Sequence, residues 1–500
     1  MTDSRDLMRD ALAVLLLGFL VVVFTWQIGL AGRVLAGGDI FTYFYPYWAE
    51  ATRAIRAGRV PLWNPFLFMG APFLANSQVG FFYPLNWPLW LLFPPHRSVH
   101  LTVVLHLFLA AFHAYAWGRR SLDLERMGAW AVGAVFALGG YLGAQAEHVN
   151  QLQGLAWLPL MLMLYDRASN SGSRNGIRSS GLLGLSTSVG LVFLAGHTQA
   201  AFISLAGLSV YGLGPVLWIC LREGTGRPMI RRALVLSVAV MIGVLLAGIQ
   251  VIPTGELVQQ SVRARGLPFN ERVSFSLSPF YLGRALLPAF GDSVSPDRIE
   301  HVAHIGAIGL VLATIGLVTA VNRQRDGRSP VASSLQSRDL GLLLLVFLGI
   351  FFALGGYNPV YLVLARFAPG FAHFRVPARW LVLYVLGMAA FVGRAVQSLR
   401  DGEYPGQPTL RLVVVSVFTL IAWATAHIWW GDGNTSVALN VILWAGTAGA
   451  AITALSAARR VPRLVVLGLI ALLVGELYLA SRLLPYARAT APQAFTSLRP

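Results

Sequence analysis

The sequence contains no lysine, and charged residues make up only 12% of its 500 positions. A soluble globular protein carries about 25% charged residues, which cover its surface in contact with water. The scarcity of charge, together with 56% hydrophobic residues, excludes a soluble protein and predicts one that crosses a membrane many times. The single cysteine, Cys220, excludes an internal disulfide.

Long apolar runs recur along the chain. A membrane-spanning helix needs about 20 mostly apolar residues, and runs near that length predict about thirteen spans. We therefore predict an all-α polytopic transmembrane bundle over residues 1–483. It is followed by an outer tail, 484–500, whose polar ending is typical of a chain cut before a further domain. The predicted spans lie near 11–31, 98–117, 127–145, 151–165, 180–196, 199–221, 233–252, 302–321, 339–355, 379–397, 411–430, 436–456 and 463–483.

The arginines predict how this bundle is oriented. With the N-terminus in the cytoplasm, each cytoplasmic loop holds at least three of the 38 arginines. The short outer turns near 146–150, 196–199 and 431–435 hold none. Short cytoplasmic loops are enriched in basic residues, so the pattern predicts a cytoplasmic N-terminus. It also accounts for much of the net charge of +17 without a nucleic-acid partner. The other arginines lie mostly in the tail and in three longer outer loops, 32–97, 253–301 and 356–378.

The first outer loop, 32–97, combines a helical pattern with turn-rich aromatic segments. Apolar residues between Ile40 and Ile55 repeat at helical spacing, which predicts a helix lying in the membrane interface. Its polar side, with Glu50 and three arginines, is expected to face lipid headgroups. Amides bond sugar hydroxyl groups and aromatic rings stack on sugar C–H faces, so the loop predicts a sugar site. An interfacial aromatic belt is the alternative for any single ring. The candidates are Tyr45, Trp63, Asn64, Asn76 and Gln78.

Asp39 follows Gly37 and Gly38 directly after the first predicted span. An acidic group so close to the membrane is a functional candidate, because its charge is costly there. The alternative is a turn in which Asp39 caps the next helix. Local sequence does not separate the two interpretations.

Arginines in the later outer loops are candidates for binding phosphate. Arg375 and Arg379 flank a proline at the start of the tenth span, and a guanidinium group suits bidentate contact with phosphate. Arg263 and Arg265 follow the seventh span, where attraction to anionic headgroups is an equal alternative. Other polar groups at outer helix ends are expected to line a site or to have structural roles: Glu147, His148, His197, Gln199 and Glu256.

The sequence gives little sign of a cofactor. Asp292 and Asp297 could share a divalent cation with Asp39, but their spacing matches no zinc or calcium signature. We predict no essential metal and no other cofactor. The chain also lacks a phosphate-binding loop of the GxxxxGK type, which argues against a nucleotide-sugar donor.

Several short motifs follow one another in a characteristic order along most of the chain. They are Gly38–Asp39, Tyr45–Pro46, Pro61–Pro65, Gly70–Pro72, Asn76, Gln78, Phe82–Asn86, His148, Trp157–Pro159, Gly196–Gln199, Gln250–Glu256 and Phe374–Arg379. Taken together, these motifs resemble the YfhO-like family of bacterial membrane proteins, and the resemblance implies a branch of the GT-C glycosyltransferases. Such enzymes take a sugar from a polyprenyl-phosphate carrier on the outer face of the cytoplasmic membrane. Their first outer loop holds a catalytic acid soon after the first helix, a position that Asp39 matches. The sequence departs from expectation at Glu476 in the last span.

These observations predict a membrane glycosyltransferase. Asp39 would take the proton of an acceptor hydroxyl, and arginines would stabilise the departing phosphate in an inverting displacement. The acceptor would be an envelope glycan, lipid or protein. A transporter or flippase of lipid-linked glycans is the alternative, although such proteins place polar sites near the bilayer midplane. A non-catalytic scaffold for envelope assembly is a third interpretation, in which Asp39 is dispensable.

Overall fold

The computed structural model describes residues 4–67, 69–169, 177–224, 226–291, 296–326, 330–368, 370–431, 437–457, 462–491 and 493. Helices dominate these ranges, and the strands found there are the short antiparallel pair β1 (Trp63–Asn64) and β2 (Ala71–Pro72). The all-α prediction is confirmed. Nine helices in the described ranges are long and apolar enough to cross a membrane, and 179–194 and 307–321 form shorter apolar helices.

Every predicted span coincides with a helix or a pair of consecutive helices. The span predicted at 151–165 divides into α8 and α9, each too short to cross a bilayer alone. The long elements are α1 (Ser4–Phe24), α5 (Pro95–Arg120), α6 (Arg126–Leu138) with α7 (Gly140–Ala144), α8 (Val149–Leu155) with α9 (Leu158–Ser169), α10 (Ser179–Leu194), α11 (Thr198–Glu223), α12 (Arg227–Leu246), α16 (Ala307–Asp326), α17 (Pro330–Ala353), α19 (Leu381–Arg400), α20 (Gln407–Gly431), α21 (Val437–Ala457) and α22 (Pro462–Ser481).

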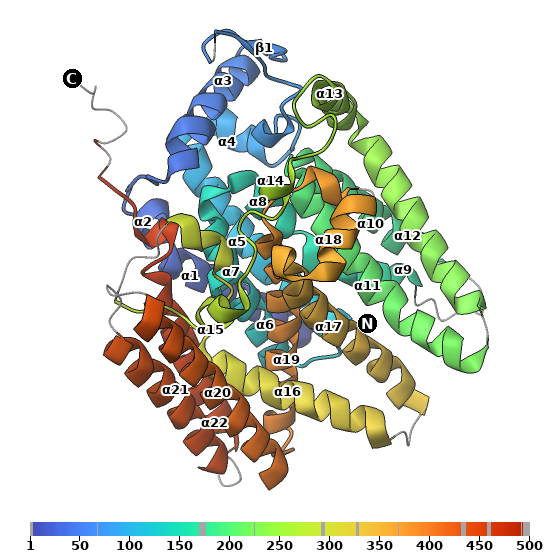
Figure 1. The fold of residues 1–500 in the computed structure, drawn as a ribbon, viewed down its shortest axis with the longest axis vertical. Coiled ribbons are helices and arrows are strands. Elements are labelled where there is room, and N and C mark those ends of the chain that lie inside the picture. Colours follow the sequence, from blue (N-terminus) through green and yellow to red (C-terminus); the bar gives the residue numbers. More distant parts are fainter. Residues whose placement is uncertain are drawn as a thin grey trace.

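Short helices connect the long ones, and α3, α4 and α13 lie together at one end of the molecule (Figure 1). The short elements are α2 (Trp26–Gly29), the π-helix η1 (Ile40–Phe44), α3 (Tyr45–Arg56), η2 (Ser77–Val79), α4 (Asn86–Leu92), η3 (Gln145–Glu147), α13 (Gly248–Gln259), α14 (Phe269–Arg272), η4 (Pro279–Tyr281), α15 (Leu282–Leu286), η5 (Pro296–His301), η6 (Gly355–Tyr357), α18 (Pro359–Phe367), η7 (Phe371–His373), η8 (Pro377–Trp380) and η9 (Pro485–Ala487).

The segments predicted to share a side of the membrane meet in the structure. At the end that we call the site end, the outer segments bond to one another: Ser77 donates to the carbonyl of Gly196 and Gln199 to that of Arg375. At the opposite end, segments predicted to be cytoplasmic form ion pairs. Nη2 of Arg126 lies 2.9 Å from Oδ1 of Asp6. The two predicted sets of loops therefore lie at opposite ends of the bundle. That the site end faces outward stays a prediction.

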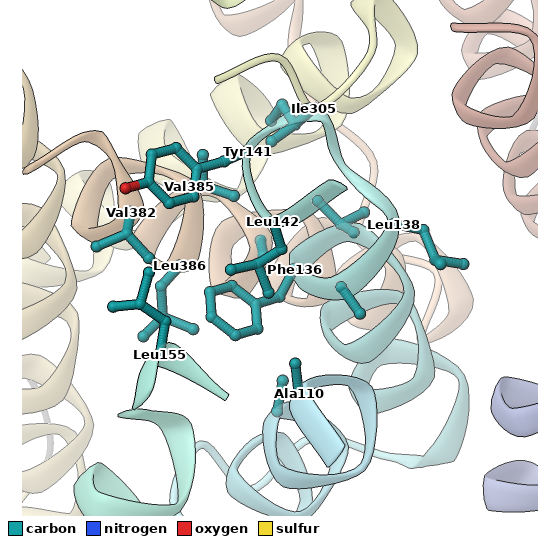
Figure 2. Packing of buried hydrophobic residues seen from close by; sticks show 14 of the residues in the cluster. Ala110, Phe136, Leu138, Tyr141, Leu142, Leu155, Ile305, Val382, Val385 and Leu386 are labelled. Carbon is teal, nitrogen blue, oxygen red and sulfur yellow. The ribbon is translucent and has the colours of Figure 1, made fainter. Parts of the chain in front are cut away.

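The centre of the bundle is formed by α5, α6 and α19. Figure 2 shows side chains of α6 and α7, such as Phe136 and Leu142, close to Leu155 of α8 and Leu386 of α19. Small residues let these helices approach closely. A Cβ atom added at Gly128 of α6 would lie 2.8 Å from the carbonyl oxygen of Gly393 in α19. The site is therefore built on closely packed helices.

The predicted interfacial helix is present as η1 and α3, and Arg53, Arg56 and Arg59 are exposed as expected, whereas Glu50 is not. Glu50 is buried, with its carboxylate 2.7 Å from Nη2 of Arg53 and 2.9 Å from Nη2 of Arg59. Arg56 donates to the backbone carbonyls of Trp90 and Phe93. These arginines bind the protein itself, which the helical periodicity alone could not indicate.

The first loop is anchored on both of its sides by side-chain hydrogen bonds. Beneath it, the hydroxyl of Tyr45 lies 2.9 Å from Nε2 of His100, and that of Tyr83 lies 2.8 Å from Nε2 of His106; both histidines belong to α5. At its rim, Gln250 of α13 donates to the carbonyl of Leu74 at 2.8 Å. The loop is therefore a fixed wall of the site end.

Glu476 in α22 joins the C-terminal helices to the bundle. Its carboxylate accepts hydrogen bonds from the backbone N–H groups of Ala307 (2.7 Å) and Ile308 (3.0 Å), the first residues of α16. Gly306, at φ +83°, makes room, because an added Cβ would lie 2.7 Å from the carboxylate. A glutamate thus caps a neighbouring helix inside the bundle, where water cannot replace the bonds.

Glu476→Leu is expected to destabilise the protein, because it leaves two buried N–H groups without an acceptor. Each such loss costs about 1–3 kcal/mol. The free energy of unfolding, measured by titrating the purified protein with denaturing detergent, checks this. Gly475→Ala is the matched control, since its added methyl group meets open space. Equal stability of Glu476→Leu and the wild type would contradict the capping role.

Candidate functional site

A cavity of about 480 Å³ opens at the site end, where η1, η2, α8, α13 and η8 converge. Segments far apart in the sequence therefore contribute side chains to one space. Most of its lining is polar, with apolar residues from the end of α13 and the turn after it. Nine residues singled out from the sequence line it: Asp39, Asn76, Gln78, His148, His197, Gln199, Arg263, Arg375 and Arg379.

The structure places six other candidates away from the lining. The Tyr45 hydroxyl bonds to His100, and Oδ1 of Asn64 accepts from the backbone N–H of Phe66, so both serve the loop's own structure. Glu147 packs behind Gly37, where an added Cβ would lie 2.1 Å from its carboxyl carbon. The remaining three are exposed beside the cavity: Trp63, Arg265 and Glu256.

The Asp39 side chain does not cap the helix that follows it. It makes no hydrogen bond to the first turn of η1, and it is 60% exposed. Its Oδ2 atom faces His148, 3.5 Å from Nε2. The turn-and-cap interpretation of Gly37–Gly38–Asp39 is therefore wrong, and the carboxylate is available to a molecule in the cavity.

Glu300, in η5, is the main site residue that the sequence did not single out. Its carboxylate receives a forked contact from Arg379, with Nη2 at 2.6 Å from Oε1 and Nε at 3.2 Å from both oxygens. Both side chains are buried. The preceding acids, Asp292 and Asp297, have side chains outside the described residues. Its place between an arginine-containing loop and a predicted span was the available signal in the sequence.

Opposite charges hold Glu300 in its ionised form. Burial is the largest single influence and would raise the carboxyl pKa, but it is outweighed by the charges of Arg379 and His148 together with hydrogen bonds from Arg379 and Gln145. The resulting pKa lies below the ordinary value of 4.5. The ion pair is therefore intact at neutral pH.

The two cavity histidines are neutral at that pH. Burial lowers the pKa of His148, and Arg379 and Arg375 add to this, against the opposing charges of Glu300 and Asp39. Burial and Arg379 lower the pKa of His197 well below its ordinary value. Nδ1 of His197 accepts from the backbone N–H of Ala200 at 3.0 Å and so caps α11.

The loop that carries Arg375 and Arg379 is held in a strained bend. Val376 has φ +61°, a left-handed conformation that costs a β-branched residue about 1–3 kcal/mol. The amide of Gln199 donates to the carbonyls of both Arg375 (2.5 Å) and Val376 (3.3 Å). This bend places Arg375 and Arg379 on the same cavity wall.

Positive charge gathers on one wall of the cavity. Burial lowers the pKa of Arg263, and the neighbouring charges of Arg375 and Arg379 lower it further. Glu300 neutralises Arg379, but within the described part of the chain no carboxylate forms an ion pair with Arg263 or Arg375. Two guanidinium groups are thus left to attract an anion, while Asp39 lies beside the phenol of Tyr43.

Over the same residues, no three His, Cys, Asp or Glu side chains are grouped so as to hold a metal ion. A divalent cation, which the GT-C resemblance allows, therefore finds no such donor set here. The expectation of no essential metal stays a prediction, and the chemistry below uses only the side chains of the chain.

Comparison with known proteins shows the fold. No family model matches the sequence, and no curated protein matches it. Archaeal oligosaccharyltransferase AglB from Archaeoglobus fulgidus, in complex with an inhibitory peptide and a dolichol-phosphate, superposes with TM-score 0.50 and 12% identity. The match covers 95% of this chain and 56% of AglB, so the chain spans about half the length of that enzyme.

ArnT from Cupriavidus metallidurans is a second similar structure. Bound to undecaprenyl phosphate it gives TM-score 0.48 and 13% identity over 94% of this chain and 76% of ArnT; in the apo state it gives 0.46 and 12% over 95% and 77%. On the likeness to AglB, the chain has the membrane-embedded fold of GT-C glycosyltransferases. The closer resemblance to the YfhO-like family stays a prediction.

Proposed function

We propose that the protein is a membrane glycosyltransferase that moves a sugar from a polyprenyl-phosphate carrier to an acceptor hydroxyl. One observation carries the proposal. In a chain with the GT-C fold, a single cavity presents the exposed carboxylate of Asp39 and the guanidinium groups of Arg263 and Arg375, which form no ion pair with a carboxylate in the described ranges. The carrier is one that AglB and ArnT also hold, as dolichol-phosphate and undecaprenyl phosphate.

The chemistry follows from this arrangement. Asp39 takes the proton of the acceptor hydroxyl as its oxygen attacks the anomeric carbon. The bond from that carbon to the carrier phosphate breaks, and the phosphate keeps the electron pair. The donor is a phosphodiester with one negative charge, whereas the departing phosphate gains a second. Arg263 and Arg375 interact more strongly with the second state, which lowers the barrier. Direct attack inverts the anomeric centre.

The proposal includes the place of the reaction. Polyprenyl-phosphate sugars presented outside the cytoplasm suit a site end that faces outward from a bacterial cytoplasmic membrane, with the N-terminus in the cytoplasm. The arginine distribution supports this orientation. The acceptor is a hydroxyl group of an envelope glycan, lipid or protein.

Transfer is tested with the purified protein in liposomes that contain polyprenyl-phosphate sugars. We expect free polyprenyl phosphate and a glycosylated acceptor to appear together. A mass-spectrometric comparison of envelope glycans between wild-type and deletion strains identifies the sugar that goes missing. Movement of intact sugar-lipid across the bilayer, without cleavage, would instead identify the transporter. If no carrier is cleaved and none is moved across the bilayer, the remaining interpretation is the non-catalytic scaffold.

Replacing Arg263 and Arg375 by glutamine is expected to weaken binding of the carrier. A hydrogen bond to a charged group contributes about 1.5–3 kcal/mol, so each substitution should lower affinity by roughly 10-fold to 100-fold. Binding to liposomes containing undecaprenyl phosphate measures it. Arg265→Gln is the control, because Arg265 is exposed outside the cavity lining. If the control weakens binding equally, general attraction to anionic lipid is the explanation.

A further inference from the structure

Five side chains form a continuous chain from the buried ion pair to the cavity. Arg379 contacts Glu300, whose Oε2 lies 3.4 Å from Nε2 of Gln145. Oε1 of Gln145 lies 2.9 Å from Nδ1 of His148, and Nε2 of His148 lies 3.5 Å from Oδ2 of Asp39. Glu300, Gln145 and Arg379 are buried, whereas Asp39 is exposed.

The ion pair determines which way the Gln145 amide points. A carboxylate can only accept hydrogen bonds, and Arg379 keeps Glu300 in that form. The amide NH₂ of Gln145 must therefore face Glu300, and its carbonyl oxygen must face His148. Because that oxygen also only accepts, Nδ1 of His148 must carry a proton.

In a neutral imidazole, a proton on Nδ1 leaves the lone pair on Nε2. That nitrogen faces two carboxylates, with Oδ2 of Asp39 at 3.5 Å and Oε1 of Glu300 at 3.9 Å. Both separations are longer than a usual hydrogen bond. One added proton would join Nε2 and the nearer oxygen, Oδ2 of Asp39, as N–H···O.

We propose that His148 is the partner of Asp39 in a catalytic dyad, and that Glu300 and Gln145 are positioning residues that fix its tautomer. The inference rests on the proposed function. The acceptor oxygen bonds to the anomeric carbon as its O–H bond breaks, and the proton passes to Oδ2 of Asp39 and then to Nε2 of His148. The bond from the anomeric carbon to the carrier phosphate breaks, and its electron pair leaves on the phosphate. After the products depart, the proton returns through the exposed Asp39 to water.

The groups around His148 suit this role. Glu300 and Asp39 are the anions that act on it, and Arg379 and Arg375 are the cations. His197 is neutral, and Glu147 adjoins in sequence. The net lowering of the His148 pKa leaves the imidazole neutral and ready for a proton. Glu300 and Asp39 then stabilise the imidazolium that forms.

The tautomer is tested without any sugar transfer. The full chain is labelled with ¹⁵N-histidine and placed in lipid bilayers, and the His148 signal is identified by its absence from His148→Asn. At pH 7 we expect a protonated Nδ1 and a bare Nε2. In Gln145→Leu, whose side chain cannot accept a hydrogen bond, the proton is expected to shift toward Nε2. A proton on Nε2 in the wild type would overturn the inference.

Kinetics test the catalytic role. His148→Gln is expected to lower kcat by roughly 10-fold to 100-fold at unchanged donor KM, and to remove the acid limb of the pH profile that His148 sets below pH 6.5. Added imidazole should partly restore His148→Ala. His373→Gln, an exposed histidine at the same end, is the control. Wild-type kcat and an unchanged acid limb in His148→Gln would overturn the dyad, whereas absence of transfer by the wild type itself would refute only the proposed function.

Discussion

Asp39→Asn is expected to lower kcat by roughly 100-fold to 10,000-fold, the usual contribution of a general base. The amide keeps the size of the side chain but cannot take a proton, so the donor KM should change little. Transfer from polyprenyl-phosphate sugars in liposomes, with kcat and KM determined separately, measures the effect.

Asp123→Asn is the matched control for this experiment. Asp123 is exposed at the opposite end of the bundle and pairs with Arg338. Its φ of +54° is one that asparagine also adopts without difficulty. The control should therefore keep full activity. If Asp39→Asn also kept it, Asp39 would not be the base and the scaffold interpretation would gain support.

Glu300→Leu is expected to reduce the free energy of unfolding by about 3–5 kcal/mol, because it leaves a buried guanidinium group unpaired. The Arg379 side chain is only 10% exposed, so water replaces the lost carboxylate poorly. The double variant Glu300→Leu/Arg379→Leu should lose less than the sum of the two single variants, since it leaves no buried charge unpaired. Unfolding in denaturing detergent measures all three.

The pH dependence of this pair has a definite sign. The pKa of Glu300 is lower in the folded protein than its ordinary value of 4.5. A carboxyl group with a lowered pKa stabilises the fold fully above its unfolded pKa and loses that contribution as pH falls through its folded pKa. Wild-type stability should therefore fall below about pH 4.5, and Glu300→Leu should show a smaller fall. Identical pH profiles would refute the pair's contribution.

Much of the architecture could be predicted from the sequence, because the two signals that govern a membrane bundle are local. Runs of apolar residues marked the spans, and arginine placement separated the loops into two sets that meet at opposite ends of the structure. The break between α8 and α9 was not predicted, since an apolar run does not reveal where a helix stops inside a protein.

Only part of the candidate site could be predicted, because some of its residues lie at span ends and others depend on contacts between distant segments. Asp39, Arg375 and Arg379 lie beside the outer ends of predicted spans, and such positions come together when spans pack side by side. Glu300 and Gln145 gain their roles through contacts between residues 79 and 155 positions apart, namely the bonds from Arg379 to Glu300 and from Gln145 to Glu300. Tyr45 and Asn64 share their residue types with sugar-binding side chains but are used to hold the loop.

The anchored first loop restricts how a long lipid can be exchanged. Bonds to α5 beneath it and to α13 at its rim oppose any lifting of this wall. The carrier should then enter and leave the cavity laterally from the bilayer, along the apolar lining residues Leu257, Val258 and Val262. A short thiol cross-link between Leu74→Cys and Gln250→Cys, with Cys220 replaced, should leave turnover unchanged. If the cross-link lowers turnover and reduction of its disulfide restores it, the first loop must move away from α13 in every cycle.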